Sequence, residues 1–295
     1  MRRLFCLLGD PVAHSLSPRI HARAFQLLGI DAVYAPCQVA AADLPTAVAG
    51  LRALGAAGFN VTVPHKSAAL SLCDRVSKEA ERIGAVSCVQ RSSEDGKLVG
   101  HNTDAPGLLR ALRGVDLDGA RVVVLGAGGS ARAAALLLSG RAGSVQIVNR
   151  TEAKARSLAA LCRAGGCSSE AAPIEAVKSA SLVVHCTTVG LGTDELPFDP
   201  ALLAPGATLV DLVYSKTGPT ALVRAALARG GALHDGRTAA ARGAGPAAAS
   251  GGASGPRAID GLAVLVHQAI ASLEIWLGRA QLDDLYAPLR EAALS

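Results

Sequence analysis

The chain is poor in aromatic and charged residues. Of its 295 residues, 3% are aromatic and 18% are charged, and the net charge of +5 is not concentrated in any basic run. Proteins that bind nucleic acids usually cluster Lys and Arg on one surface, often with aromatic side chains that stack on bases. We therefore expect no nucleic-acid partner.

The cysteine patterns of disulfide frameworks and metal sites are also missing. The seven cysteines include no CxxC pair and no histidine at metal-ligand spacing, and their number is odd. This pattern favours free thiols in a reducing compartment. We expect no metal and a cytoplasmic location.

No apolar run approaches the length of a membrane span. Residues 4–8 begin like a signal peptide, but the run ends at Gly9-Asp10-Pro11, which indicates a first strand instead. We expect small-molecule ligands, no membrane contact, and a monomer or a homodimer.

What the chain does have is a regular alternation of short apolar runs with Ala- and Leu-rich helical stretches. Such alternation predicts an α/β fold with parallel sheets. The runs are residues 4–8, 32–36, 59–63, 86–90, 121–126, 144–149, 181–186 and 208–213.

Residues 237–257 differ in composition from the rest of the chain. They contain no large apolar side chain and consist almost entirely of Ala, Gly, Ser, Pro, Thr and Arg. Such a segment cannot bury enough surface to offset the entropy lost on ordering, so we interpret it as a flexible insertion.

A glycine-rich turn follows the apolar run at 121–126. The sequence Gly126-Ala-Gly128-Gly129-Ser130-Ala131 lies between a predicted strand and a predicted helix, the context of a dinucleotide-binding turn. Gly126 makes the turn, Gly128 lets a pyrophosphate approach the backbone, and small Ala131 allows close helix packing. The alternative is a tight turn without a ligand.

The end of the next strand distinguishes the two dinucleotides. An NAD site usually has a carboxylate about 20 residues after the glycine turn, where this chain has Asn149-Arg150-Thr151. A guanidinium and a hydroxyl suit the 2′-phosphate of NADP. Alternatively, Thr151 only caps a helix and Arg150 is solvated.

Two hydroxyls precede the first predicted helix. Ser15 and Ser17 lie just before Pro18, and a helix start with hydroxyls and free N–H groups suits a carboxylate. Ser17 could instead be the helix N-cap.

A lysine follows the strand at 59–63. The chain has 6 lysines against 23 arginines, and lysine can release its proton whereas arginine cannot. Asn60 and Thr62 share one side of this strand, and Lys66 stands at its exit. A solvated lysine at a helix start is the alternative.

Asp104 ends the sequence GHNTD (100–104), before another predicted helix. It could serve only as an N-cap. Beside a lysine, however, its carboxylate could orient an ammonium group for acid–base chemistry.

Six motifs in order resemble the shikimate dehydrogenase family, whose members reduce 3-dehydroshikimate with NADPH. They cover nearly the whole chain: GDPVAHSLSPRIH (9–21), NVTVPHK (60–66), GHNTD (100–104), LGAGGSARA (125–133) with NRT (149–151), DLVY (211–214) and DGLAVLVHQA (260–269).

This resemblance implies a role for each matching residue. Lys66 would donate the proton to the ketone oxygen, and Asp104 would orient Lys66. The implied substrate-binding residues are Ser15, Ser17, Asn60, Thr62, Ser87, Thr103, Tyr214 and Gln268. The implied NADP-binding residues are Gly126, Gly128, Gly129, Ser130, Ala131, Asn149, Arg150 and Thr151.

The resemblance also implies two domains. We expect a substrate domain at 1–104 that is completed by C-terminal helices at 260–295, a Rossmann-type NADP domain at 105–236, and the flexible insertion at 237–259.

Several positions depart from the family pattern. Ser87-Cys88 stands where the family has Asn-Thr, Ala22 replaces an asparagine, His185-Cys186-Thr187 replaces an Asn-Ala-Thr turn, and Ser215-Lys216 replaces Asn-Pro. Because the family's asparagine at position 87 contacts substrate, Ser87 puts affinity or substrate choice in question.

These departures leave alternative functions to weigh. A paralogue acting on quinate or an aminoshikimate is suggested by Ser87, and a non-catalytic binding protein is disfavoured because Lys66 and Asp104 are both present. A folate or glutamyl-tRNA type dehydrogenase would not explain Ser15 and Ser17.

Overall fold

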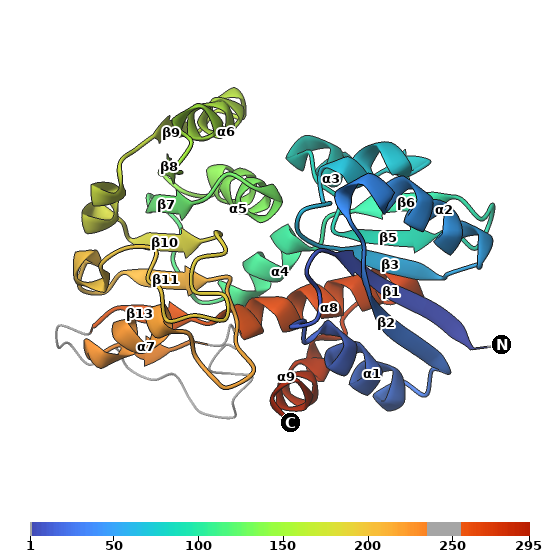
Figure 1. Ribbon diagram of the computed structural model, residues 1–295. Coiled ribbons are helices and arrows are strands. Elements are labelled where there is room, and N and C mark those ends of the chain that lie inside the picture. Colours follow the sequence, from blue (N-terminus) through green and yellow to red (C-terminus); the bar gives the residue numbers. More distant parts are fainter. Residues whose placement is uncertain (1, 235–254) are drawn as a thin grey trace. The chain divides into compact units, whose positions relative to one another are not determined.

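The computed structural model describes residues 2–234 and 255–295, which form two compact units (Figure 1). Unit 1 comprises Met1–Gly107 and Val266–Ser295, and unit 2 comprises Leu108–Leu265. Both divisions fall inside helices, α4 (Asp104–Ala111) and α8 (Gly261–Leu277). The sequence placed these boundaries at 104/105, where the motif GHNTD ends, and at 259/260, where the motif DGLAVLVHQA begins, because it cannot show that each helix continues from one unit into the other.

The sheet of unit 1 has the strand order β2-β1-β3-β5-β6-β4. Its strands are β1 (Arg3–Gly9), β2 (Ala32–Gln38), β3 (Gly58–Val61), β4 (Arg75–Val76), β5 (Cys88–Arg91) and β6 (Leu98–His101). Strand β5 runs antiparallel to both β3 and β6, whereas the pairings of β1 with β2, β1 with β3 and β4 with β6 are parallel, as the α/β pattern of the sequence predicts. The six residues between β5 and β6 are enough for a hairpin but too few for a parallel crossover.

Helices cover both faces of this sheet: α1 and α9 lie on one side, and α2 and α3 on the other (Figure 1). Unit 1 contains α1 (Ser17–Leu27), α2 (Leu44–Ala53), α3 (Lys78–Ile83) and α9 (Tyr286–Leu294), with short 3₁₀ helices η1 (Ala41–Asp43), η2 (Ala68–Leu72) and η6 (Asp283–Leu285).

Alternation along β1 and β3 divides the core of unit 1 between the two faces. Cys6 and Phe59 belong to the cluster that includes helix α2, whereas the ring of Phe5 lies 4.6 Å from that of Trp276 on α8. Because side chains alternate along a strand, Asn60 shares the α8 face, where its amide contacts Ser272. The polar residues of β3 are therefore presented on the α8 side.

Unit 2 is a doubly wound parallel sheet with the order β12-β13-β11-β10-β7-β8-β9. The strands are β7 (Arg121–Leu125), β8 (Ser144–Val148), β9 (Ser168–Ala171), β10 (Leu182–His185), β11 (Thr208–Asp211), β12 (Ala232–Leu233) and β13 (Arg257–Ile259). Helices α5 (Gly129–Ser139), α6 (Glu152–Ala164) and α7 (Ala221–Ala228) and the 3₁₀ helices η3 (Ile174–Ser179) and η4 (Pro200–Leu202) connect them. The strand order reverses at β7, between β8 and β10, and such a switch point is where open α/β sheets bind ligands.

The predicted insertion ends earlier than the sequence suggested. Most of it, residues 237–254, lies outside the described residues. Residues 257–259 form strand β13, which pairs in parallel with β11, and Ala258 and Ile259 are buried. The apolar pair followed by Asp260 was the strand signal that the neighbouring Ala- and Gly-rich stretch obscured.

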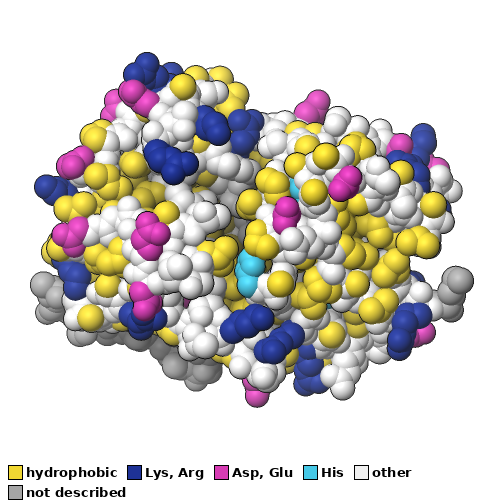
Figure 2. Space-filling view, in the orientation of Figure 1, with side chains coloured by type: hydrophobic (Ala, Val, Ile, Leu, Met, Phe, Trp, Pro, Cys, Tyr) yellow, Lys and Arg dark blue, Asp and Glu magenta, His cyan; other side chains and the backbone are white. Residues whose placement is uncertain are grey.

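Charged side chains are interspersed over the molecular face in Figure 2, where Lys and Arg lie in small groups with Asp and Glu among them. Among the described residues, none of the helices combines the length and the apolar character that crossing a bilayer requires.

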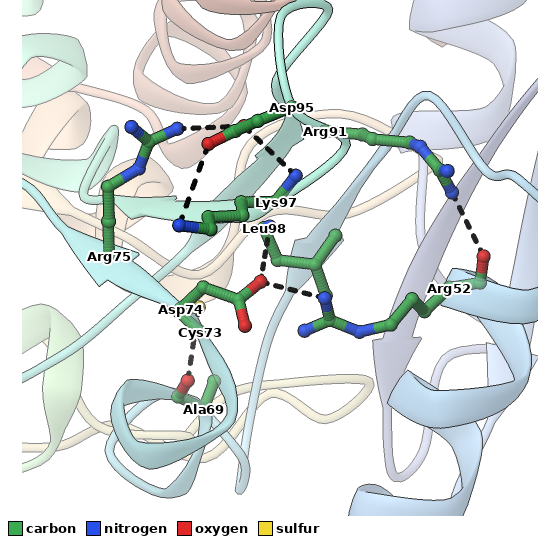
Figure 3. A network of polar contacts seen from close by, with 9 residues as sticks. All are labelled: Arg52, Ala69, Cys73, Asp74, Arg75, Arg91, Asp95, Lys97 and Leu98. Carbon is green, nitrogen blue, oxygen red and sulfur yellow. Dashed lines mark hydrogen bonds and ion pairs between the residues drawn. The ribbon is translucent and has the colours of Figure 1, made fainter.

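A network of ion pairs fastens the edge of the unit 1 sheet (Figure 3). The Asp74 carboxylate accepts hydrogen bonds from the Arg52 guanidinium (2.8 Å) and the Leu98 backbone N–H (2.7 Å). Nearby, Arg75 on β4 pairs with Asp95 at 3.1 Å. The Arg52 hydrogen bond, followed by that of Leu98, lowers the pKa of Asp74.

Asp74→Asn is expected to destabilise the protein by about 1 kcal/mol at pH 7, the magnitude typical of a partly exposed ion pair. Since the folded-state pKa of Asp74 is lowered, its contribution is present above the unfolded pKa of about 3.9 and is lost as pH falls through the folded value. Denaturant unfolding should show the full difference at pH 6–7, and the difference should shrink steadily as the pH is lowered below about 3.9. Asp43→Asn, at an exposed residue of the same unit, is the matched control; an equal loss there would contradict the assignment.

Candidate active site

The most prominent polar feature of unit 1 is a largely buried ion pair between Lys66 and Asp104. The Lys66 Nζ lies 2.5 Å from Asp104 Oδ2, and the two side chains are 12% and 5% exposed. The residues come from different elements, the exit of β3 and the first turn of α4. The fold thus joins two motifs that lie 38 residues apart in the chain.

The backbone around Lys66 is held on both sides. The preceding residue, His65, is buried and its Nε2 lies 2.7 Å from the carbonyl oxygen of Val39, while the Lys66 carbonyl accepts from the Val86 N–H at 2.8 Å. The proline that follows this strand suggests a helix start at Pro64, but that expectation is wrong. The His65 N–H closes a turn onto Thr62 O, and the first helical residue is Ala68.

Asp104 is not the cap of its helix. The side-chain oxygen of Asn102 accepts from the backbone N–H groups of Asp104 (3.0 Å) and Ala105 (3.3 Å), and its amide donates to the Ala85 carbonyl at 3.0 Å. Asn102 caps the helix, so the Asp104 carboxylate is available to Lys66. Sequence reasoning missed this role, although asparagine is a favoured N-cap residue.

Ser87, which departs from the family pattern, supports Thr103 from within the core. Its Oγ accepts from the Thr103 N–H at 2.8 Å and lies 3.0 Å from the Thr103 hydroxyl, and Ser87 is only 3% exposed. Both residues are buried, so the hydroxyl at position 87 is already engaged inside the protein.

Asn60 is held by three partners. Its Oδ1 accepts from the Tyr34 hydroxyl (2.9 Å), and its Nδ2 donates to Ser87 O (3.1 Å) and Ser272 Oγ (3.0 Å). Both amide hydrogens are committed, so only the remaining carbonyl lone pair could contact a ligand. Tyr34 and Ser272 were not identified from the sequence, because no local spacing links them to Asn60.

The serine cluster adjoins the exit of β3. Ser15 Oγ accepts from the Ser17 N–H at 3.2 Å, and Leu16 occupies the N-cap position, so Ser17 is not the cap. Backbone pairing of Asp10 N–H with Val63 O at 2.9 Å joins this loop to the segment containing Thr62. Gly9 permits the contact, since a Cβ there would lie 2.3 Å from the Thr62 methyl group.

Gln268 lies beside the first turn of α4. A Cβ on Gly107 would lie 2.9 Å from the Gln268 backbone nitrogen and 2.5 Å from its Cγ. Gly107 follows Asp104 by three residues and so shares a helix face with it. The glycine allows close packing that brings Gln268 to the same turn as the ion pair.

In unit 2, the predicted glycine turn joins β7 to α5. Gly126 has φ +115°, which only glycine adopts readily, and its N–H donates to Val148 O at 2.8 Å. Gly128 precedes α5, whose N-terminus has no side-chain cap, and a Cβ on Gly128 would meet no protein atom within 4 Å. Buried Ala131 allows close packing. Open space beside uncapped N–H groups fits a pyrophosphate.

The candidate 2′-phosphate residues follow β8. Asn149 Nδ2 donates to Thr151 O at 2.9 Å, and Thr151 occupies the N-cap position of α6 without a side-chain hydrogen bond, so its hydroxyl does not cap the helix. Arg150 is exposed and forms no ion pair within the part of the chain that the structure describes.

The remaining predicted residues are placed as follows. Tyr214 is half-buried in unit 2, in the segment after β11, where Ser215 Oγ lies 2.9 Å from Thr217 Oγ1. Ala22 is exposed on α1, so this departure affects no buried contact. Over residues 2–234 and 255–295, no group of three His, Cys, Asp or Glu side chains could hold a metal ion.

Comparisons with known proteins show the family to which the chain belongs. The family model for the shikimate dehydrogenase substrate binding domain matches residues 7–89, and that for shikimate / quinate 5-dehydrogenase matches residues 109–189. A shikimate dehydrogenase (NADP(+)) of Geobacter metallireducens is 38% identical over 94% of this chain and 91% of its own length.

Solved structures extend the likeness to the whole fold. The crystal structure of shikimate 5-dehydrogenase from Thermus thermophilus, in complex with NADP(H) and shikimate, is 34% identical with a TM-score of 0.79, covering 99% of this chain and 100% of that one. A 5-ketofructose reductase of Gluconobacter is 31% identical with a TM-score of 0.77, covering 99% and 98%. The motifs, the fold and the relatives agree, and the chain belongs to the shikimate dehydrogenase family.

Proposed function

We propose that the protein is an NADP-dependent shikimate dehydrogenase, an oxidoreductase that reversibly reduces 3-dehydroshikimate to shikimate on the route to aromatic amino acids. The observation that carries the proposal is the Lys66–Asp104 ion pair, which is largely buried. Hydrogen bonds fix the backbone beside Lys66, and the Asn102 side chain fixes the backbone N–H of Asp104. The names of its relatives point to the same substrate and cofactor.

Lys66 is the proton donor in this proposal. NADPH, when bound, supplies the hydride that reduces the ketone carbon. The Lys66 ammonium gives its proton to the ketone oxygen and takes it back from the hydroxyl in the reverse direction. Asp104 accepts from the ammonium and so fixes its direction.

The other residues bind and orient the ligands. Ser15 and Ser17 hold the substrate carboxylate with hydroxyls and helix N–H groups. The residues proposed for the ring hydroxyls are Asn60, Thr62, Ser87, Thr103, Tyr214 and Gln268. For NADP they are Gly126, Gly128, Gly129, Ser130 and Ala131 at the pyrophosphate and Asn149, Arg150 and Thr151 at the 2′-phosphate. We also propose that the protein works in the cytoplasm, as a monomer or a homodimer; its seven free cysteines support a reducing compartment.

An assay of reduced-nicotinamide absorbance tests the proposal. Purified protein is given shikimate, quinate, an aminoshikimate and fructose derivatives in turn, each with NADP(H) and with NAD(H). We expect the highest kcat/KM with shikimate and NADP. Turnover of none of the cyclic carboxylates would reject the proposal.

One similar structure is a 5-ketofructose reductase, so a neutral ketose is the most informative alternative substrate to compare with shikimate. Shikimate carries a carboxylate and a ketose does not, so Ser15→Ala should raise KM for shikimate while leaving any ketose activity unaffected. An equal effect on both substrates would remove Ser15 from carboxylate binding.

A second candidate, a paralogue acting on quinate or an aminoshikimate, is favoured by one observation, the serine at position 87. Ser87→Asn is expected to tighten shikimate binding by about 2–10-fold, the value of one added hydrogen bond. An asparagine oxygen could still accept from Thr103 N–H, as Ser87 Oγ does now, while its amide extends further.

Isothermal titration with shikimate measures the change, and Ser87→Ala, which removes the bond to Thr103, should weaken binding. Weaker binding by Ser87→Asn would show that the pocket is built around the serine, and the quinate or aminoshikimate hypothesis would then gain support.

A further inference from the structure

A polar chain of four side chains, three of them buried and Thr187 half-buried, crosses the carboxyl edge of the unit 2 sheet. His185, the last residue of β10, places Nδ1 2.8 Å from Asp211 Oδ1 and Nε2 2.5 Å from the Thr187 hydroxyl. Asp211, the last residue of β11, accepts from the Thr220 hydroxyl through its other oxygen. His185 and Asp211 are each about 1% exposed. The chain thus links the start of α7, two strand ends and the loop after β10.

The hydrogen positions follow from the donors and acceptors present. The Asp211 carboxylate also accepts from the Val213 N–H at 3.0 Å, so it acts only as an acceptor, and the hydrogen it shares with His185 belongs to Nδ1. Thr187 Oγ1 accepts from the Val189 N–H at 3.3 Å, and its own hydrogen can be donated to His185 Nε2. With the imidazole hydrogen assigned to Nδ1, each of these atoms has a hydrogen-bond partner.

This chain lies at the switch point of the sheet. His185 pairs with Leu125 across β10 and β7, and the Cys186 N–H donates to Leu125 O at 2.9 Å. Gly126 immediately follows Leu125, the last residue of β7. A Cβ built there would lie 3.4 Å from both the Cys186 carbonyl and the Thr187 methyl group. Thr187 therefore touches His185 with its hydroxyl and borders the glycine turn with its methyl group.

We infer that His185 and Asp211 are positioning residues for the dinucleotide: through Thr187 they hold the loop at 186–192 against the glycine turn. The inference rests on the proposed function only in that the ligand of this turn is NADP(H). A loop fixed before binding reduces the ordering entropy that the ligand would otherwise cost. Affinity for the dinucleotide then depends on a hydrogen bond that makes no contact with it.

Two substitutions at Thr187 separate the hydroxyl from the methyl group. Thr187→Val keeps the methyl beside Gly126 and removes the hydroxyl from His185, leaving a buried ring nitrogen without its donor. Thr187→Ser keeps the hydroxyl beside His185 and removes the methyl group beside Gly126. Thr193→Val is the matched control, because Thr193 is exposed in the same unit and, among the residues that the structure describes, its hydroxyl accepts only a 3.4 Å contact from Glu195 N–H.

Fluorescence titration with NADPH, without substrate, measures the dissociation constant. We expect Thr187→Val to weaken binding about 5–20-fold, the range for a lost buried hydrogen bond, whereas Thr187→Ser stays within about threefold and Thr193→Val matches the wild type. Hydrogen–deuterium exchange at 186–192 in the ligand-free protein should rise in Thr187→Val alone. Equal binding by Thr187→Val and wild type, or equal losses in Thr187→Val and Thr187→Ser, would overturn the inference.

His185→Asn is a second route if Thr187→Val fails to fold, which thermal denaturation reveals. An asparagine is too short to reach both Asp211 and Thr187, so it should also weaken NADPH binding and increase exchange at 186–192; wild-type values in both would overturn the inference. Failure of the proposed function looks different, since the wild-type protein itself would then bind no NADPH. Wild-type binding with no effect of the variants rejects the positioning role alone.

Discussion

Lys66→Met is expected to lower kcat for shikimate oxidation by about 10²–10⁴-fold, the contribution typical of a positioned acid–base group. The thioether occupies much of the volume of the lysine stem but cannot exchange a proton. Binding of shikimate should persist, because the proposed contacts to its carboxylate come from Ser15 and Ser17. Steady-state kinetics give kcat, and calorimetric titration of the variant gives the shikimate dissociation constant separately.

Two control variants distinguish the effect of the positive charge at position 66 from the effect of proton transfer. Lys66→Arg keeps a cation beside Asp104 but cannot release a proton, so its kcat should fall nearly as far as that of Lys66→Met. Lys78→Met, at an exposed lysine of α3, should keep wild-type activity. Unchanged kcat in Lys66→Met would remove the lysine from the reaction, and substantial activity in Lys66→Arg would mean that only its charge is needed.

Stability must be followed in the same variants. Removing one member of a buried ion pair costs about 3–5 kcal/mol, because the other charge is left in a poorly solvated site. The double variant Lys66→Met with Asp104→Asn should recover much of that loss without recovering kcat. This combination shows that lost activity in Lys66→Met is not a consequence of unfolding.

The Lys66–Asp104 ion pair could be predicted from the sequence only as two motifs. Nothing in the spacing of Lys66 and Asp104 says that they meet; the family resemblance implied it, and the fold places their side chains 2.5 Å apart. Their supports were less visible. Asn102, rather than Asp104, caps helix α4, so the Asp104 carboxylate can contact Lys66. The Asn60 amide donates a hydrogen bond to Ser272, which lies 212 residues away in the chain. Contacts of that range are determined by packing rather than by local pattern.

The positions of the longer apolar strands were predicted more completely than the way in which the strands pair in the sheets. All eight apolar runs overlap strands, because burial imposes a recognisable apolar run. The strands β4, β6, β9, β12 and β13 went unrecognised, because none of them contains more than two consecutive large apolar residues. Likewise, His185 looked like a turn substitution, and only the fold shows its ring buried between Asp211 and Thr187.

Cofactor choice gives the other large expected effect. Arg150→Asp should weaken NADPH binding by at least about 10²-fold while leaving NADH binding within about threefold. The change removes a charge-assisted hydrogen bond, worth about 1.5–3 kcal/mol, and adds a carboxylate that repels the 2′-phosphate. The same carboxylate resembles the acidic residue that accepts ribose hydroxyls in NAD sites.

A graded series tests whether the effect comes from the 2′-phosphate. Arg150→Gln removes the charge without adding repulsion, so its loss of NADPH affinity should lie between those of wild type and Arg150→Asp. Arg156→Gln is the matched control, because Arg156, on helix α6, is also exposed but pairs with Glu152. Raising the salt concentration should narrow the difference between wild type and Arg150→Gln, since screening weakens exposed charge pairs. Parallel losses for NADPH and NADH would place Arg150 away from the 2′-phosphate, because only a contact to that group distinguishes the two dinucleotides.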